Sequence, residues 1–164
     1  MTPAQVVSQL KKFNEDLPVI VGTEMVEFAL DNFDKQGFQG NSFKQWKVKN
    51  PKPGRTIGVK TGRGRRSIRY KKLSEGRVEA GTDLDYMAAL NEGKLLKVRL
   101  TVKSRKFFWA MFYKTNNPKW KNMALTKKKV LSIQLPELKF IDNSPALDQR
   151  IQQKIDVRLK KILS

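Results

Sequence analysis

The side chains that most often carry out chemistry in proteins are scarce in this chain of 164 residues. It contains no histidine and no cysteine, which excludes a disulfide, a thiolate metal site, a cysteine nucleophile and an imidazole base. Carboxylates are neighbours in sequence at Glu15/Asp16 and at Asp83/Asp85. Such neighbouring acids more often cap turns and solubilise the chain than form acid–base pairs. We therefore expect no enzymatic activity, no metal and no cofactor.

One glycine-containing segment, Lys60–Ser67, invites comparison with phosphate-binding loops. Its sequence, KTGRGRRS, lacks the spacing of glycine, four residues, glycine, lysine and serine or threonine that such loops need. A turn explains the segment better, with glycines at positive φ ahead of a strand that starts near Ser67.

Charge is the strongest feature of the composition. Lysine and arginine number 34 against 15 aspartate and glutamate residues, which gives a net charge of +19. The charges are segregated: thirteen basic residues and no acid lie between Asp34 and Glu75, and twelve basic residues and no acid lie between Gly93 and Pro136. This distribution predicts polar faces of opposite charge and a polyanionic or acidic partner.

The first acid-free stretch contains a predicted long basic loop over residues 37–66, which is rich in glycine and proline. Loops of this length are usually functional or disordered. No zinc finger, RNA-recognition signature or helix-turn-helix pattern accompanies it, so contacts to phosphates or to an acidic protein surface are expected rather than base recognition. The candidate contact residues for DNA or an acidic partner are Lys47, Lys49, Arg55, Lys60, Arg63, Arg65 and Arg66.

Aromatic residues gather in the second acid-free stretch. The apolar run Phe107–Tyr113 has seven residues, far fewer than the roughly 20 that span a bilayer, so no membrane partner is expected. Residues 104–113 fit a buried strand or a buried helix, and we favour the helix. Aromatic side chains beside arginine and lysine are typical anchors of a core or of a subunit interface. The candidate anchors are Trp46, Phe107, Phe108, Trp109 and Phe112.

The length favours a single domain over residues 1–164, and the pattern predicts an α+β fold. N-terminal helices and a C-terminal helix are expected to pack on a small antiparallel sheet, with the long basic loop between elements. Thr2, Pro3 and Gln5 form a capping pattern for a first helix, and a second is expected to start at residues 16–18 and to end at Gly37. The other expected elements are a hairpin over 67–72 and 77–81, a helix over 83–92, strands over 95–102 and 131–135, and a helix from Ser144.

From about Phe38 to Ile141 the order of landmarks resembles the phage virion morphogenesis family, the tail-completion proteins of Mu-like and P2-like phages. The landmarks are Gly40 with Trp46, Thr61-Gly62-Arg63 leading to Arg66-Ser67-Ile68, Gly81-Thr82, Tyr86-Met87-Ala88 through Asn91-Glu92-Gly93, and Ile133 to Ile141. Residues 94–129 correspond to an insertion that some members carry. The chain departs from the family pattern at Gly58, Gly64, Leu138 and Asp142.

The resemblance implies a structural protein of phage or prophage virion assembly that acts in tail completion or head–tail joining as a subunit of a ring. Its implied partners are further copies of itself and other tail or head-connector proteins, with non-specific DNA contact where the ring lies on the DNA path. Its implied location is the virion, and the host cytoplasm during assembly. The alternative is a non-enzymatic nucleic-acid-binding protein that uses the basic loop.

Overall fold

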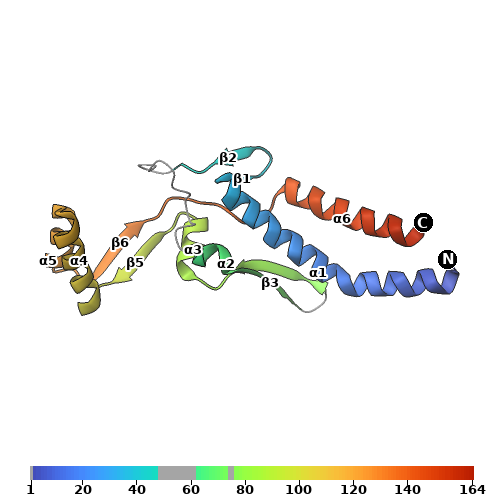
Figure 1. Cartoon of the computed structure of the whole chain (residues 1–164), viewed down its shortest axis with the longest axis horizontal. Coiled ribbons are helices and arrows are strands. Elements are labelled where there is room, and N and C mark those ends of the chain that lie inside the picture. Colours follow the sequence, from blue (N-terminus) through green and yellow to red (C-terminus); the bar gives the residue numbers. More distant parts are fainter. Residues whose placement is uncertain (1, 48–61, 74–75) are drawn as a thin grey trace. The chain divides into compact units, whose positions relative to one another are not determined.

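The computed structural model describes residues 2–47, 62–73 and 76–164. Its helices and small antiparallel sheets form an α+β fold, as predicted (Figure 1). By its internal contacts the chain divides into two compact units. Unit 1 comprises Met1–Gly93 and Pro136–Ser164, and unit 2 comprises Lys94–Leu135. The expected insertion at 94–129 therefore lies within unit 2.

The first element of unit 1 is one long helix, α1 (Pro3–Lys35), where the sequence predicted two helices. The predicted capping box of Thr2 and Gln5 is present at its start. Pro18 lies inside the helix, because proline removes one backbone hydrogen bond without ending a helix that is held by its neighbours. The second half of α1 packs against β3, β4 and α6, so the tertiary contacts carry the helix past Pro18. It ends at Lys35, and the capping residue Gln36 has a φ of 55°.

The strands of unit 1 pair as two local antiparallel hairpins rather than as one sheet. Strands β1 (Gly37–Gln39) and β2 (Phe43–Gln45) form the first, inside the segment predicted as a loop. The second joins β3 (Ile68–Lys72) to β4 (Val78–Thr82), in the register Tyr70 opposite Ala80, and confirms the predicted hairpin. A short helix, α2 (Arg63–Arg66), precedes β3, and α3 (Asp85–Asn91) follows β4.

The core of unit 1 forms where the C-terminal part of α1 meets these elements. Phe33 and Phe140 are each 1 % exposed, and their rings lie 5.1 Å apart. Trp46 packs edge-on against Phe33 at 5.2 Å, and Met87 and Ile68 complete the cluster. Residues far apart in sequence thus enclose one apolar centre, which provides most of the stabilisation of such a unit.

The C-terminal helix, α6 (Pro145–Leu163), runs antiparallel to α1 and packs against it (Figure 1). Ser144 caps it as predicted: its Oγ accepts from the backbone N–H of Leu147 and donates to the carbonyl of Gln39. Leu147 is buried, and Ile151, Ile155, Leu159 and Ile162 are half-buried. These residues, at four- and three-residue steps, form the apolar stripe by which α6 packs against α1.

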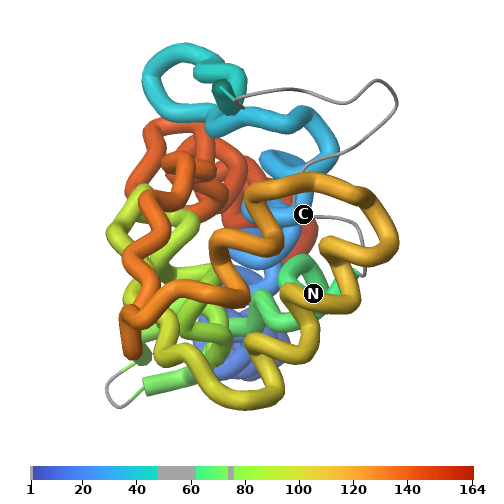
Figure 2. Tube along the Cα trace, turned by 90° about the vertical axis from the view of Figure 1, so that its left-hand side faces the viewer, coloured from blue at the N-terminus to red at the C-terminus, as the bar shows by residue number. Residues whose placement is uncertain are grey.

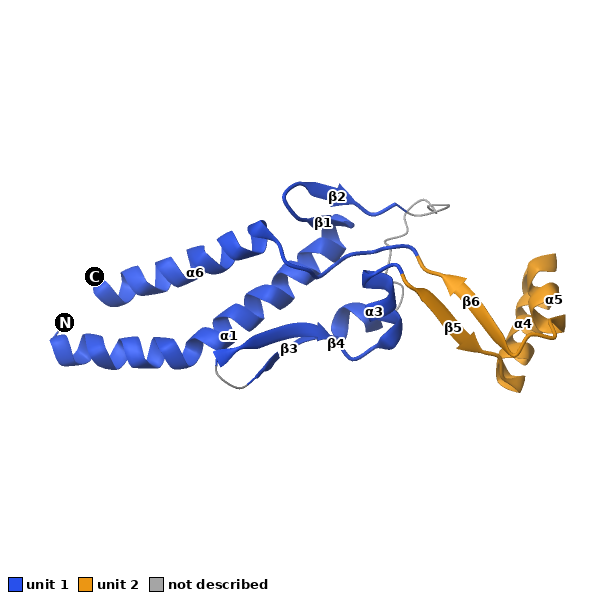
Figure 3. Cartoon of the chain, turned by 180° about the vertical axis from the view of Figure 1, so that it is seen from behind, with its two compact units in different colours: residues 1–93, 136–164 blue, residues 94–135 orange. Residues whose placement is uncertain are grey.

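Unit 2 consists of a strand pair and a pair of helices (Figures 2 and 3). Strands β5 (Leu95–Arg99) and β6 (Val130–Gln134) are antiparallel, with Val98 opposite Leu131. Between them lie α4 (Val102–Thr115) and α5 (Pro118–Leu125), which pack against each other. The helix preferred for residues 104–113 is confirmed. Within the described ranges, none of the helices combines the length and the apolar character that crossing a bilayer requires.

Candidate functional site

The landmark segments of unit 1 meet around residues 138–141, a stretch that is neither helix nor strand. Side chains satisfy its backbone groups. Asn91 Oδ1 accepts from the N–H groups of Phe140 at 2.9 Å and Ile141 at 3.1 Å, and its amide donates to the carbonyl of Ile141. Asn32 donates to the carbonyl of Phe140, and Trp46 Nε1 donates to that of Lys139 at 2.8 Å. The residues at this junction therefore hold the fold together.

Trp46 accordingly lies in the core, at 8 % exposure. Of the two glycines in the predicted turn before β3, Gly62 has the expected positive φ, 65°. Gly64 instead lies buried inside α2, where an added Cβ would be 2.5 Å from the sulfur of Met87. Gly64 thus allows close packing of α2 on α3, a different role from the one predicted.

A cluster of ion pairs joins α1 to α6. Glu24 is 2 % exposed and accepts from Arg150 Nε at 2.6 Å, while Lys154 Nζ lies 3.2 Å from its second oxygen. Arg150 also donates to Asp31 at 2.6 Å. Burial lowers the pKa of Arg150, but its hydrogen bonds to Asp31 and Glu24 outweigh that effect and raise it overall. The guanidinium stays charged and fastens the two helices.

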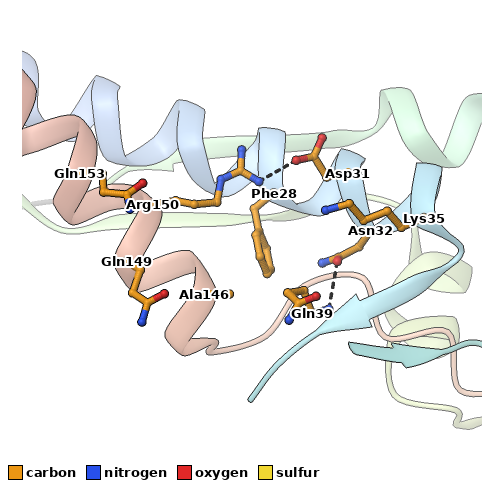
Figure 4. Close-up of a pocket in the computed structure, with 9 residues that line it drawn as sticks. All are labelled: Phe28, Asp31, Asn32, Lys35, Gln39, Ala146, Gln149, Arg150 and Gln153. Carbon is orange, nitrogen blue, oxygen red and sulfur yellow. Dashed lines mark hydrogen bonds and ion pairs between the residues drawn. The ribbon is translucent and has the colours of Figure 1, made fainter. Parts of the chain in front are cut away.

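A hollow of about 230 Å³ lies beside this cluster, between the ends of α1 and α6 (Figure 4). Figure 4 shows Arg150 reaching across to Asp31, and Asn32 directed at Gln39. The Arg150 guanidinium also lies 5.8 Å from the ring centre of Phe28. Arg150, Asp31 and Asn32 already form hydrogen bonds or ion pairs within the protein. We therefore interpret the hollow as a gap in the packing of the two helices rather than as a ligand site.

The basic residues predicted to contact DNA or an acidic partner are only partly described. Lys49, Arg55 and Lys60 lie outside the described residues, as do all residues of the predicted loop from 48 to 61. Lys47 is exposed just after β2. Arg63, Arg65 and Arg66 belong to α2, and Arg65 forms a two-pronged ion pair with Asp34 at 2.6 and 2.7 Å. The described part of the segment therefore contains a hairpin, a helix and an arginine with an internal partner, which corrects the expectation of an open loop there.

The predicted aromatic anchors of unit 2 divide by exposure. Phe108 is 9 % exposed and its ring stacks with Trp120 at 6.0 Å. Trp109 and Phe112 are half-buried, whereas Phe107 is 55 % exposed. Of the candidates, Trp46 and Phe108 are core residues, and Phe107 alone lies largely in solvent.

Sequence reasoning missed the role of Arg105. Its guanidinium donates to the carbonyls of Ala124 at 2.8 Å and Thr126 at 2.7 Å, and more weakly to that of Lys128. It thereby caps the end of α5 and shapes the turn that carries Lys127–Lys129. Sequence reasoning also missed the buried ion pair between Glu24 and Arg150. A carboxylate four residues before Phe28, on the apolar side of α1, was the signal that could have indicated a buried ion pair.

Lys139 and Asp142 form an exposed ion pair next to the Phe140 junction, at 2.7 Å. The hydrogen bond between them lowers the pKa of Asp142 and raises that of Lys139. Asp142 stands at one of the positions where the chain departs from the family pattern. Both side chains are solvent-exposed, so the pair adds little to stability.

Three or more carboxylates do not cluster as a metal site within the part of the chain that the structure describes. Comparison with models of known protein families, with curated proteins and with solved structures finds no match.

Proposed function

We propose that this chain is a structural protein of phage or prophage virion assembly, acting in tail completion or head–tail joining as a ring subunit. The observation that carries the proposal is the way the resembling segments fit together. Trp46 and Asn91, which come from two separate landmarks, both hydrogen-bond to the backbone of the third landmark at residues 139–140, and Phe140 of that landmark shares the core of unit 1 with Trp46. The landmarks, which are separate in the sequence, therefore lie together in one core.

The division into units supports the same proposal. Gly93 and Pro136 border unit 2, and an added Cβ on Gly93 would lie 2.9 Å from the Cβ of Glu137. The chain thus leaves unit 1 and returns to it at nearly the same point. Unit 2 has the form of an insertion in a self-contained fold, as the resemblance implies for residues 94–129.

The use of charged residues in unit 1 also favours a role in assembly over one in catalysis. Glu24, the buried carboxylate among the described residues, is bound to Arg150 and Lys154.

A ring subunit needs two complementary faces. The α1–α6 pair offers exposed apolar residues along its length for such contacts: Val7, Val19, Val157 and Leu163.

Gene context and particle composition test the proposal. The gene should lie among capsid, tail-sheath and tail-tube genes, and purified particles should contain the chain at a small fixed number of copies, measured by quantitative mass spectrometry. A gene set among metabolic genes, or particles that form normally and lack the chain, would contradict the proposal. A monomer in solution would not, because assembly proteins often close into rings only on a template.

A further inference from the structure

We infer that unit 2 binds the phosphate backbone of nucleic acid through the exposed lysines of α4 and of the turn after α5. The unit carries twelve basic residues and no carboxylate, whereas all 15 acidic residues of the chain lie in unit 1. No ion pair can therefore form inside unit 2, and its positive charges repel one another. A polyanion would relieve that repulsion and release its own counterions.

Helix α4 presents its lysines on the side that faces solvent. Its other side is occupied: Phe108 stacks on Trp120 of α5, and Met111 and Phe112 are half-buried. Lys103, Lys106 and Lys114 are exposed, and their spacing places them on one face of the helix. At 1.5 Å per residue they extend over about 16 Å, a length along which one DNA strand places about five phosphates.

A second group of lysines lies at the end of α5. Lys127, Lys128 and Lys129 are consecutive and exposed. Arg105 fixes the backbone of this turn through its bonds to the carbonyls of Ala124 and Thr126. The turn therefore carries its three charges on a held backbone rather than on a free segment, and a held array loses less entropy on binding.

The partner class follows from how apolar and charged groups are distributed. A membrane-surface helix turns its apolar face outward into the lipid, but that face of α4 packs on α5. Lysine is depleted from the centres of protein–protein interfaces, and ten of the twelve basic residues are lysines. Lysine serves as a point charge for phosphate. We therefore expect contacts to the backbone and no recognition of base sequence.

Tyr113 adds an aromatic ring beside these lysines. The side chain of Tyr113 is 78 % exposed, and the residue directly precedes Lys114 in α4. Exposed aromatic rings stack on the unpaired bases of single strands. Substitution of Tyr113 distinguishes the two possible forms of the ligand, since it should weaken binding to a single strand and leave duplex binding unchanged.

Fluorescence anisotropy with the full chain tests the inference, using a labelled 30-base-pair duplex and a labelled 30-nucleotide single strand over a range of salt concentrations. The test variant is K103Q/K106Q/K114Q. The matched control is K11Q/K12Q/K160Q, which removes the same charge from exposed sites on α1 and α6. Circular dichroism checks that both variants fold.

We expect salt-dependent binding by the unaltered chain. The test variant should lose at least about tenfold in affinity at low salt, and the slope of log affinity against log salt should fall by up to about three, one for each lost phosphate contact. The control variant should stay within about threefold of the unaltered chain, since those lysines belong to unit 1 and not to the proposed binding surface.

Four outcomes would overturn the inference. They are binding at background level for both nucleic acids at low salt, an equal loss in the control variant, tighter binding to poly-glutamate than to either nucleic acid, and binding to vesicles of phosphatidylserine and phosphatidylcholine without binding to nucleic acid. The last two would identify an acidic protein or a membrane as the partner. None of them bears on the role in virion assembly, which particle composition tests separately.

Discussion

At the scale of single residues, the close packing of α1 on β3 depends on Gly22. A Cβ at this position would lie 2.3 Å from the Tyr70 ring. In an exposed helix, replacing glycine by alanine stabilises by about 1 kcal/mol. Here the clash should reverse the sign, and we expect Gly22→Ala to lower the free energy of unfolding by about 1–3 kcal/mol, measured by denaturant titration.

Thr23→Ala, at the exposed neighbouring position, is the matched control and should leave stability unchanged or slightly raised. Combining Gly22→Ala with Tyr70→Ala should cost less than the two changes summed, because the smaller side chain makes room for the new methyl group. Strict additivity of the pair would show that the two residues do not touch.

Glu24 is the second residue on which unit 1 depends. Glu24→Gln removes the buried negative charge that Arg150 and Lys154 share and leaves Arg150 with Asp31 alone. We expect a loss of roughly 1–3 kcal/mol in the free energy of unfolding. Thermal and denaturant unfolding would measure it.

Glu27 offers the comparison for this substitution. It is 50 % exposed and lies 3.9 Å from the same Lys154, so Glu27→Gln should change stability by less than about 0.5 kcal/mol. Equal effects of the two substitutions on the free energy of unfolding would mean that the burial of Glu24 contributes nothing to stability.

At the scale of elements, Arg105 organises the turn between α5 and β6. Arg105→Ala should leave the carbonyls of Ala124 and Thr126 without their donor and loosen residues 124–130. We expect faster amide hydrogen exchange there, at least about tenfold for the amides that the turn protects, while α1 and α6 stay unchanged.

Lys106→Ala is the control for Arg105→Ala, since Lys106 is the exposed next residue on α4. It should not alter exchange in the turn. If Arg105→Ala also left exchange unchanged, the guanidinium would not be what holds the turn.

Elements defined by local patterns were predictable from the sequence. The caps at Thr2 and Ser144 and the hairpin of β3 and β4 follow from propensity and spacing over a few residues, whereas the apolar run in α4 fits a strand as well as a helix. The continuation of α1 past Pro18 was not predictable in this way, because contacts with β3 and α6 decide it. The same is true of the β1–β2 hairpin, which pairs within a segment rich in turn residues.

Of the proposed binding surface on unit 2, only the positive charge was predictable from the sequence. The acid-free stretch 94–135 is visible in the sequence, but its separation as unit 2 is a property of the fold. Arg105 bonds to carbonyls about 20 residues away, and Glu24 meets Arg150 across 126 positions. Such pairings are set by tertiary packing, which no local pattern in the chain encodes.

At the scale of the whole molecule, the chain consists of a self-contained unit 1 and an inserted, carboxylate-free unit 2. Because Gly93 and Glu137 are adjacent in unit 1, residues 94–135 should be replaceable by a short glycine linker. The shortened chain should keep its helical circular dichroism and unfold cooperatively, since the core around Phe33 and Phe140 lies wholly in unit 1.

Loss of cooperative unfolding in the shortened chain would show that unit 2 is needed for the fold of unit 1. A linker of equal length inserted after Gly76, an exposed residue just before β4, controls for the effect of the linker itself. The shortened chain should also lose affinity for nucleic acid.

The proposed role in virion assembly requires that the gene lie in a phage or prophage, and deleting the gene there tests the proposal most directly, with particles scored by electron microscopy. We predict separate, filled heads and unattached tails in the deletion strain, and normal virions when the intact gene is supplied from a plasmid. Complete, infectious virions in ordinary numbers from the deletion strain would contradict the account.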